Sequence, residues 1–96
     1  MSEPILRRRY VCSGSVQGVG FRYRAWQAAE AVGATGWVRN DWDGGVTMEL
    51  QGTQAQHDRV LQALRQSRYI TLARVETETL PPDPDERRFA VLDDRW

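Results

Sequence analysis

A glycine-rich turn near the start of the chain separates a segment with strand periodicity from a segment with helix periodicity, and this junction limits the possible folds more than any other feature. It has the sequence Val16-Gln17-Gly18-Val19-Gly20-Phe21-Arg22. Glycines let the backbone curl so that successive N–H groups point inward, which makes a concavity suited to an anion. The N-terminus of the following helix adds a partial positive charge there, and Arg22 adds a full one.

The glycine pattern by itself leaves two interpretations open. One is a phosphate cradle, because a guanidinium is planar, permanently charged and able to bind two phosphate oxygens at once. In this interpretation the phosphate is held by residues of the turn, namely Gln17, Gly18, Val19, Gly20, Phe21 and Arg22. The other interpretation is a tight strand-to-helix turn with a surface arginine, since such turns are common between elements.

Periodicity along the rest of the chain predicts alternating strands and helices. Helices are expected from Phe21 to Val32 and after Thr53, where Thr53-Gln54-Ala55-Gln56 fits a capping box. Strands are expected over residues 6–13, 36–40, 46–51, 71–79 and 88–93. The order β-α-β-β-α-β predicts a ferredoxin-like sandwich of the α+β class, with two helices on one face of an antiparallel sheet. Residues 1–96 are expected to form a single domain.

The faces of two strands can also be assigned. Alternation over residues 46–51 places Thr47, Glu49 and Gln51 on a solvent-facing side, opposite a buried apolar side. The three consecutive arginines at positions 7–9 alternate across the first strand, so at least one is expected to point outward on each side. We interpret this run as a contribution to solubility rather than as a binding stripe.

Composition excludes several classes of chemistry. All 13 basic residues are arginines, and the absence of lysine excludes a Walker-type phosphate loop and Schiff-base chemistry. One histidine and one cysteine offer no set of about three ligands for a catalytic metal. We expect His57 to be a packed or partly exposed helix residue and Cys12 to be a buried structural thiol. No metal or cofactor is therefore expected.

Charge is unevenly distributed, although the formal net charge is zero. Residues 1–40 contain six arginines and two glutamates, a balance of +4, whereas residues 41–96 contain seven arginines and eleven acidic residues. The basic half contains the glycine-rich turn, so its field is expected to attract small anions toward that turn.

A second segment favours the phosphate interpretation of the turn. Gly36-Trp37-Val38-Arg39-Asn40 is expected to form a short strand that ends in an asparagine, followed by the turn Asp41-Trp42-Asp43-Gly44-Gly45. Residues 14–52 as a whole resemble the acylphosphatase family. The resemblance is carried, in order, by Gly14-x-Val16-Gln17-Gly18-Val19-Gly20-Phe21-Arg22, by Gly36-Trp37-Val38-Arg39-Asn40, by Asp43-Gly44 and by Gly52.

This resemblance implies a small enzyme that hydrolyses the carboxyl–phosphate bond of acyl phosphates to a carboxylate and inorganic phosphate. It also implies that Arg22 binds the phosphate and that Asn40 positions the attacking water. Without the resemblance, Asn40 is a natural turn residue. The amide suits the implied role, because its carbonyl accepts a proton from water and its amino group donates to a second oxygen.

No general base is evident beside these residues. Phosphoryl transfer tolerates this, because its transition state is loose and catalysis consists mostly of positioning and charge stabilisation. Our hypothesis is that a phosphate oxygen of the substrate takes the proton of the water. The aromatic residues Tyr23, Trp26 and Trp42 either cover the sheet or line the acyl side of the pocket.

Other functions fit parts of the pattern. A nucleic-acid module with this element order would need aromatic residues on its central strands, and residues 46–50 contain none. A non-catalytic phosphate binder would need no amide to position water. An acylphosphatase-like domain also occurs in larger proteins that handle carbamoyl phosphate, a role that this chain would perform in trans.

The resemblance weakens after Gly52. Family members often have a Gly-Pro turn where residues 67–72 stand, and the tail Asp93-Asp94-Arg95-Trp96 also departs from the pattern. These departures concern the acyl-group preference and the packing of the C-terminus.

The expected partners are a small acyl phosphate and inorganic phosphate, without nucleic acid or membrane, and the chain is expected to be a monomer. No apolar run is long enough to span a bilayer, and the N-terminus lacks the apolar stretch of a secretory signal. One cysteine cannot form an internal disulfide, so the cytoplasm is the expected compartment.

Overall fold

The computed structural model describes residues 3–93, and residues 94–96 of the unusual tail lie outside this range. The elements follow the predicted order, with ends within two residues of those expected. They are β1 (Leu6–Ser15), α1 (Phe21–Val32), β2 (Thr35–Asn40), β3 (Val46–Gly52), α2 (Gln54–Arg65), β4 (Thr71–Leu80) and β5 (Phe89–Val91).

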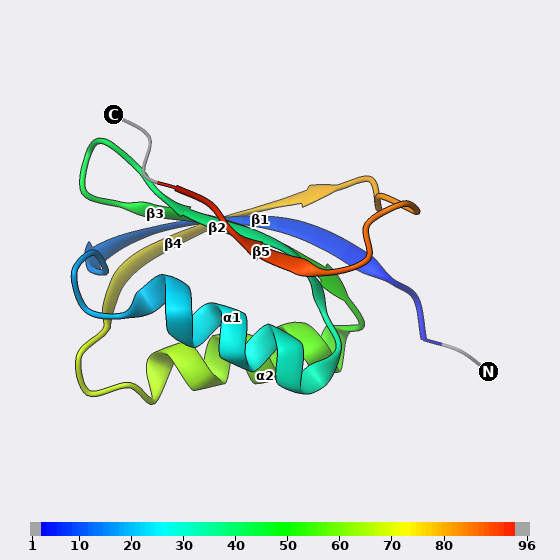
Figure 1. The fold of residues 1–96 in the computed structure, drawn as a ribbon, viewed down its shortest axis with the longest axis horizontal. Helices are drawn as coiled ribbons and strands as arrows, with labels where there is room; N and C mark the ends of the chain where they lie inside the picture. The colour runs from blue at the N-terminus through cyan, green and yellow to red at the C-terminus, as the bar shows by residue number, and fades with distance from the viewer. Residues whose placement is uncertain (1–2, 94–96) are drawn as a thin grey trace.

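The strands form one sheet in the order β4-β1-β3-β2-β5. The pairings of β4 with β1, β1 with β3 and β3 with β2 are antiparallel, as expected. β5 instead pairs in parallel with β2, so the complete sheet is mixed. Both helices lie on the same face of the sheet (Figure 1), which confirms the ferredoxin-like α+β arrangement.

The hydrophobic core lies between the sheet and the helices. Its members alternate along the strands and recur at helical spacing on α1 and α2, and they include Tyr10, Cys12, Phe21, Ala25, Ala29, Val38, Val46, Met48, Leu50, Val60 and Leu64. Cys12 is fully buried, as predicted, and burial raises the pKa of its thiol to about 11.

His57 is more deeply buried than the sequence indicated, since its side chain is inaccessible to solvent. Its Nδ1 lies 2.7 Å from the Tyr10 hydroxyl and its Nε2 lies 2.8 Å from the Leu6 carbonyl oxygen. Because a carbonyl only accepts hydrogen bonds, Nε2 carries the proton and Nδ1 accepts from Tyr10. Burial lowers the pKa of His57, which keeps the ring neutral.

The opposite face of the sheet is less exposed than predicted. Thr47 and Glu49 were expected to face solvent, and this expectation is wrong, because both are buried. Arg7 and Arg9 of β1 cover Glu49 with ion pairs of 3.0 Å and 2.9 Å, and the Thr47 hydroxyl donates to Asp41 at 2.6 Å.

The interpretation of Arg7 as a solubility residue is also wrong. Its guanidinium donates to both carboxylate oxygens of Glu86, at 2.9 Å and 3.1 Å, and it is almost fully buried. Burial alone would lower the pKa of Arg7, but the hydrogen bonds to Glu86 and Glu49 outweigh it and raise that pKa. This contact holds residues 81–88, which lead from β4 at one edge of the sheet to β5 at the other.

Candidate active site

The turn between β1 and α1 depends on two glycines with positive φ. Gly18 has a φ of 70° and Gly20, the N-cap of α1, has a φ of 80°. A Cβ added at either position would meet nothing within 4 Å. The left-handed backbone, and not a lack of space, therefore favours glycine at both positions. No side chain caps α1. The N–H groups of its first turn therefore receive no hydrogen-bond acceptor from an N-cap side chain.

The side chain of Gln17 fastens this turn to the hairpin between β2 and β3. Its Nε2 donates to the carbonyl oxygens of Asp41, at 2.6 Å, and Gly45, at 2.8 Å. Val19 is half-buried and packs against the core. Neither Gln17 nor Val19 is among the residues that line the pocket described next.

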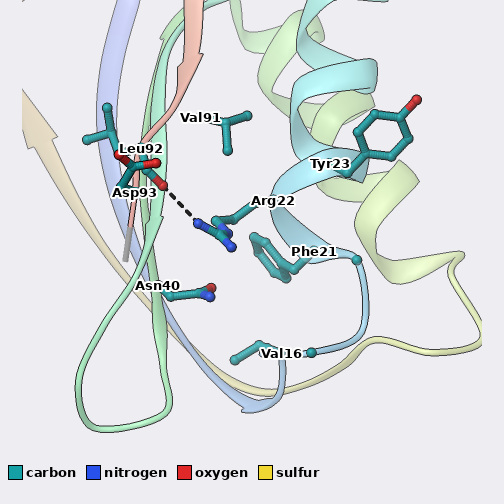
Figure 2. A pocket seen from close by; sticks show the side chains of 10 residues that line it. Val16, Phe21, Arg22, Tyr23, Asn40, Val91, Leu92 and Asp93 are labelled. Carbon is teal, nitrogen blue, oxygen red and sulfur yellow. Dashed lines mark hydrogen bonds between the residues drawn. The ribbon is translucent and has the colours of Figure 1, made fainter. Parts of the chain in front are cut away.

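A pocket of about 540 Å³ opens beside the N-terminus of α1. Arg22 enters it from the first turn of α1, and Asn40, at the end of β2, enters it from the sheet. Figure 2 shows the two side chains directed toward the same space. The complete lining is Val16, Gly18, Gly20, Phe21, Arg22, Tyr23, Asn40, Val91, Leu92 and Asp93.

The two polar side chains are held by the surrounding structure. Nη1 of Arg22 donates to the carbonyl oxygen of Leu92 at 2.8 Å (dashed line in Figure 2). Asn40 is only 8% exposed and pairs across the sheet with Val46. A guanidinium held at one nitrogen keeps its other N–H groups directed along a defined plane, which suits recognition of an oxyanion.

The other two arginines near these residues have different partners. Arg24 donates from Nε to the Ala63 carbonyl at 2.6 Å, which joins α1 to α2. Arg39 donates to Asp41 at 3.0 Å and lies over the Trp37 ring at 5.1 Å. Neither lines the pocket.

The sequence did not indicate the part of the pocket that β5 supplies. Val91, Leu92 and Asp93 stand about 70 residues after Arg22, and they reach it only because β5 pairs in parallel with β2. A segment of three strand residues carries too little periodicity to predict its partner.

Within residues 3–93, no group of three or more histidine, cysteine, aspartate or glutamate side chains is arranged to hold a metal ion. Neither of the helices in this range has the length and apolar character needed to cross a bilayer.

The family model described as Acylphosphatase matches residues 8–91, which include the turn, Arg22, Asn40 and all of β5. The chain belongs to the acylphosphatase family. An acylphosphatase from Koribacter versatilis (strain Ellin345) is 37% identical over 92 residues, covering 95% of this chain and 84% of that protein.

Solved structures agree with this assignment. The crystal structure of acylphosphatase from Bacillus subtilis superposes with a TM-score of 0.82 at 27% identity, covering 91% of this chain and 98% of that one. Full-length HypF in its phosphate- and nucleotide-bound form shares the fold, with a TM-score of 0.84 at 18% identity, and this chain covers 13% of it. The reaction of this chain is hydrolysis of the carboxyl–phosphate bond of acyl phosphates.

Proposed function

We propose that Arg22 and the main-chain N–H groups of residues 17–22 hold the phosphoryl group of an acyl phosphate, and that Asn40 orients the attacking water. One observation supports this division of roles above all. Arg22 and Asn40, from a helix and a strand, line the same pocket at the uncapped N-terminus of α1. A helix N-terminus favours phosphate through both its N–H groups and its partial charge.

The reaction then requires only water and these groups. The water oxygen attacks phosphorus, the bond from phosphorus to the acyl oxygen breaks, and its electron pair leaves on the carboxylate. The proton of the water passes to a phosphoryl oxygen of the substrate. Arg22 and the N–H groups stabilise the charge on the phosphoryl oxygens, which is the main contribution that a protein makes to this class of reaction.

His57 takes no part in this scheme. Its two ring nitrogens are used by Tyr10 and the Leu6 carbonyl, and it does not line the pocket. If a protein base were required, the buried neutral imidazole could not act without leaving both partners. We therefore expect kcat to show no dependence on the ionisation of this histidine.

β5 has a positioning role in the proposed site. The Leu92 carbonyl accepts from Nη1 of Arg22, and residues 81–88 before β5 are held by the bidentate contact of Arg7 with Glu86. The orientation of Arg22 thus depends on a strand contributed by the far end of the chain.

Hydrolysis of benzoyl phosphate, followed by its ultraviolet absorbance with EDTA present, tests these roles. Arg22→Ala and Asn40→Ala are each expected to lower kcat by about a hundredfold or more, as for the loss of a preorganised charge-stabilising group. Arg59→Ala, which removes an exposed arginine from α2, is the control and is expected to leave kcat unchanged. Full activity in both site variants would contradict the proposal.

The same measurement separates an enzyme from a binder. Suppose that phosphate binding depends on Arg22 but no acyl phosphate is hydrolysed. This result would support the phosphate-binding site and contradict the catalytic role of Asn40. Activity with EDTA supports metal-independent hydrolysis, which we also propose. Residues 1–96 are proposed to act as one domain and as a cytoplasmic monomer without nucleic acid, and gel filtration tests the oligomeric state.

A further inference from the structure

Exposed apolar side chains are among the residues that line the pocket. Tyr23 is 62% exposed and Val91 is 46% exposed, although both are large hydrophobic residues that line the pocket. Trp26, one turn further along α1, is also exposed and touches Tyr23. Large apolar side chains left accessible at the rim of a pocket are typical of a ligand-binding surface.

The residues that line the pocket are of two chemical kinds. The turn, Arg22 and Asn40 supply N–H groups and positive charge, whereas Tyr23 and Val91 supply an aromatic ring and a branched aliphatic side chain. In Figure 2, Tyr23 and Val91 lie on α1 and β5 respectively, with Arg22 between these two elements. A volume of about 540 Å³ is in the range that holds a small organic molecule.

The Tyr23 ring is held in place before any ligand binds. It stacks on the Trp26 ring with centroids 5.8 Å apart and an interplanar angle of 27°. Residues three apart on a helix are neighbours, so this pair needs no tertiary contact to form. An aromatic ring that is already ordered loses little conformational entropy when a ligand packs against it.

Asp93 adds a negative charge to the lining of the pocket. Among the described lining residues, the charged side chains are Arg22 and Asp93. Arg22 serves the phosphoryl group in the proposed function, so an acyl group with its own carboxylate or phosphate would bring a further negative charge into a pocket that Asp93 already lines. Like charges close together in a partly enclosed site are unfavourable.

We propose that Tyr23 and Val91 bind the acyl group and that, together with Asp93, they select an uncharged, flat and apolar one. This inference rests on the proposed function, because it assumes that the phosphoryl group lies at Arg22. It assigns substrate specificity to α1 and β5, and it predicts that an aromatic acyl phosphate is preferred to acetyl phosphate.

The first test compares kcat/KM for benzoyl phosphate and acetyl phosphate in the full chain, Tyr23→Ala and Tyr69→Ala. The ratio of the two values is expected to fall about tenfold in Tyr23→Ala, which corresponds to about 1.4 kcal/mol. Tyr69 is 66% exposed and outside the pocket, so its variant is expected to keep the ratio. Tyr23→Phe, which keeps the ring, is expected to restore it.

The second test uses a substrate whose benzoyl ring carries an additional negative charge. Asp93→Asn is expected to raise kcat/KM for 4-carboxybenzoyl phosphate about threefold or more relative to benzoyl phosphate. An unchanged benzoyl-to-acetyl ratio in Tyr23→Ala overturns the assignment of Tyr23, and an unchanged preference in Asp93→Asn overturns the assignment of Asp93.

Acetyl phosphate distinguishes failure of this inference from failure of the proposed function. If its hydrolysis depends on Arg22 and Asn40 while the benzoyl-to-acetyl ratio of kcat/KM is unchanged in Tyr23→Ala, the acyl-group inference is wrong and the proposed function stands. If its hydrolysis does not depend on Arg22, the proposed function is wrong and the inference falls with it.

Discussion

The two helices of this fold begin in different ways. α2 begins with Thr53, whose side chain accepts from the Gln56 N–H while Gln56 Oε1 accepts from the Thr53 N–H at 2.7 Å. Nε2 of Gln56 donates to the Val32 carbonyl at 2.6 Å, and the next residue, His57, is fully buried. α1 begins with Gly20 in the left-handed conformation, has no side-chain cap and opens on a pocket.

The difference shows which helix terminus is available for a ligand. At α2, polar atoms of the protein satisfy the first turn, and a capping box of this kind stabilises the helix without leaving room for an anion. At α1, the N-cap glycine is in the left-handed conformation, whereas Thr53 is extended, and the glycine contributes no side-chain acceptor. The stabilisation that a cap would provide is absent from the terminus that, in the proposed function, receives the phosphoryl group.

Among the changes that distinguish the two helix termini, substitution of Arg22 is expected to have the largest effect. Arg22→Lys keeps the positive charge but loses the planar fork that donates to Leu92 and, as proposed, to a phosphoryl oxygen. We expect kcat/KM for benzoyl phosphate to fall by about tenfold or more in Arg22→Lys and by about a hundredfold or more in Arg22→Ala. Wild-type kinetics in Arg22→Lys would show that only the charge matters.

A smaller loss is expected from Gly20→Ala. The left-handed φ of 80° costs an alanine about 1–2 kcal/mol, and relief of this strain would shift the N–H groups of the first turn. We expect both the free energy of unfolding and kcat/KM to fall, the latter by roughly tenfold.

Gly44→Ala is the matched control for Gly20→Ala. Gly44 has a φ of 93°, its added Cβ would also meet nothing within 4 Å, and it does not line the Arg22 pocket. Urea unfolding should show similar destabilisation in both variants, with kcat/KM reduced in Gly20→Ala alone. Equal kinetic effects would assign the loss to general destabilisation.

At the α2 terminus the expected effects are on stability alone. Thr53→Ala removes the acceptor of the capping box and is expected to lower the free energy of unfolding by about 1 kcal/mol, or Tm by roughly 4–8 °C. Thr53→Ser keeps the cap and should retain stability. Kinetic constants for acyl phosphates are expected to stay unchanged, and a fall in kcat would mean that the two termini are coupled.

The mildest perturbation is a decrease in pH through the ordinary pKa of histidine, about 6.5. Burial lowers the pKa of His57 in the folded state, so between the two pKa values the unfolded chain binds more protons. The contribution of His57 to stability is therefore complete above about pH 6.5 and decreases as pH falls below it. In His57→Gln, the free energy of unfolding measured with urea should no longer show this part of its pH dependence. An unchanged slope of that free energy against pH would contradict the assignment to His57.

How far the sequence predicts this protein depends on the range of the interactions involved. The turn at residues 16–22, the helix from Phe21 to Val32 and the capping box at Thr53 rest on contacts within a few residues, so their patterns were sufficient. Arg22 and Asn40 were identified through a resemblance, and the structure places both on one pocket.

The tertiary structure decided the features that join distant parts of the chain. Arg7 is buried because Glu49 and Glu86, 42 and 79 residues away, neutralise it, and nothing near Arg7 in the sequence indicates those partners. The parallel pairing of β5 with β2 likewise brings Leu92 to Arg22 across 70 residues. Local propensity determined where the strands and helices of this chain lie, whereas burial and charge pairing between distant segments determined what surrounds its candidate active site.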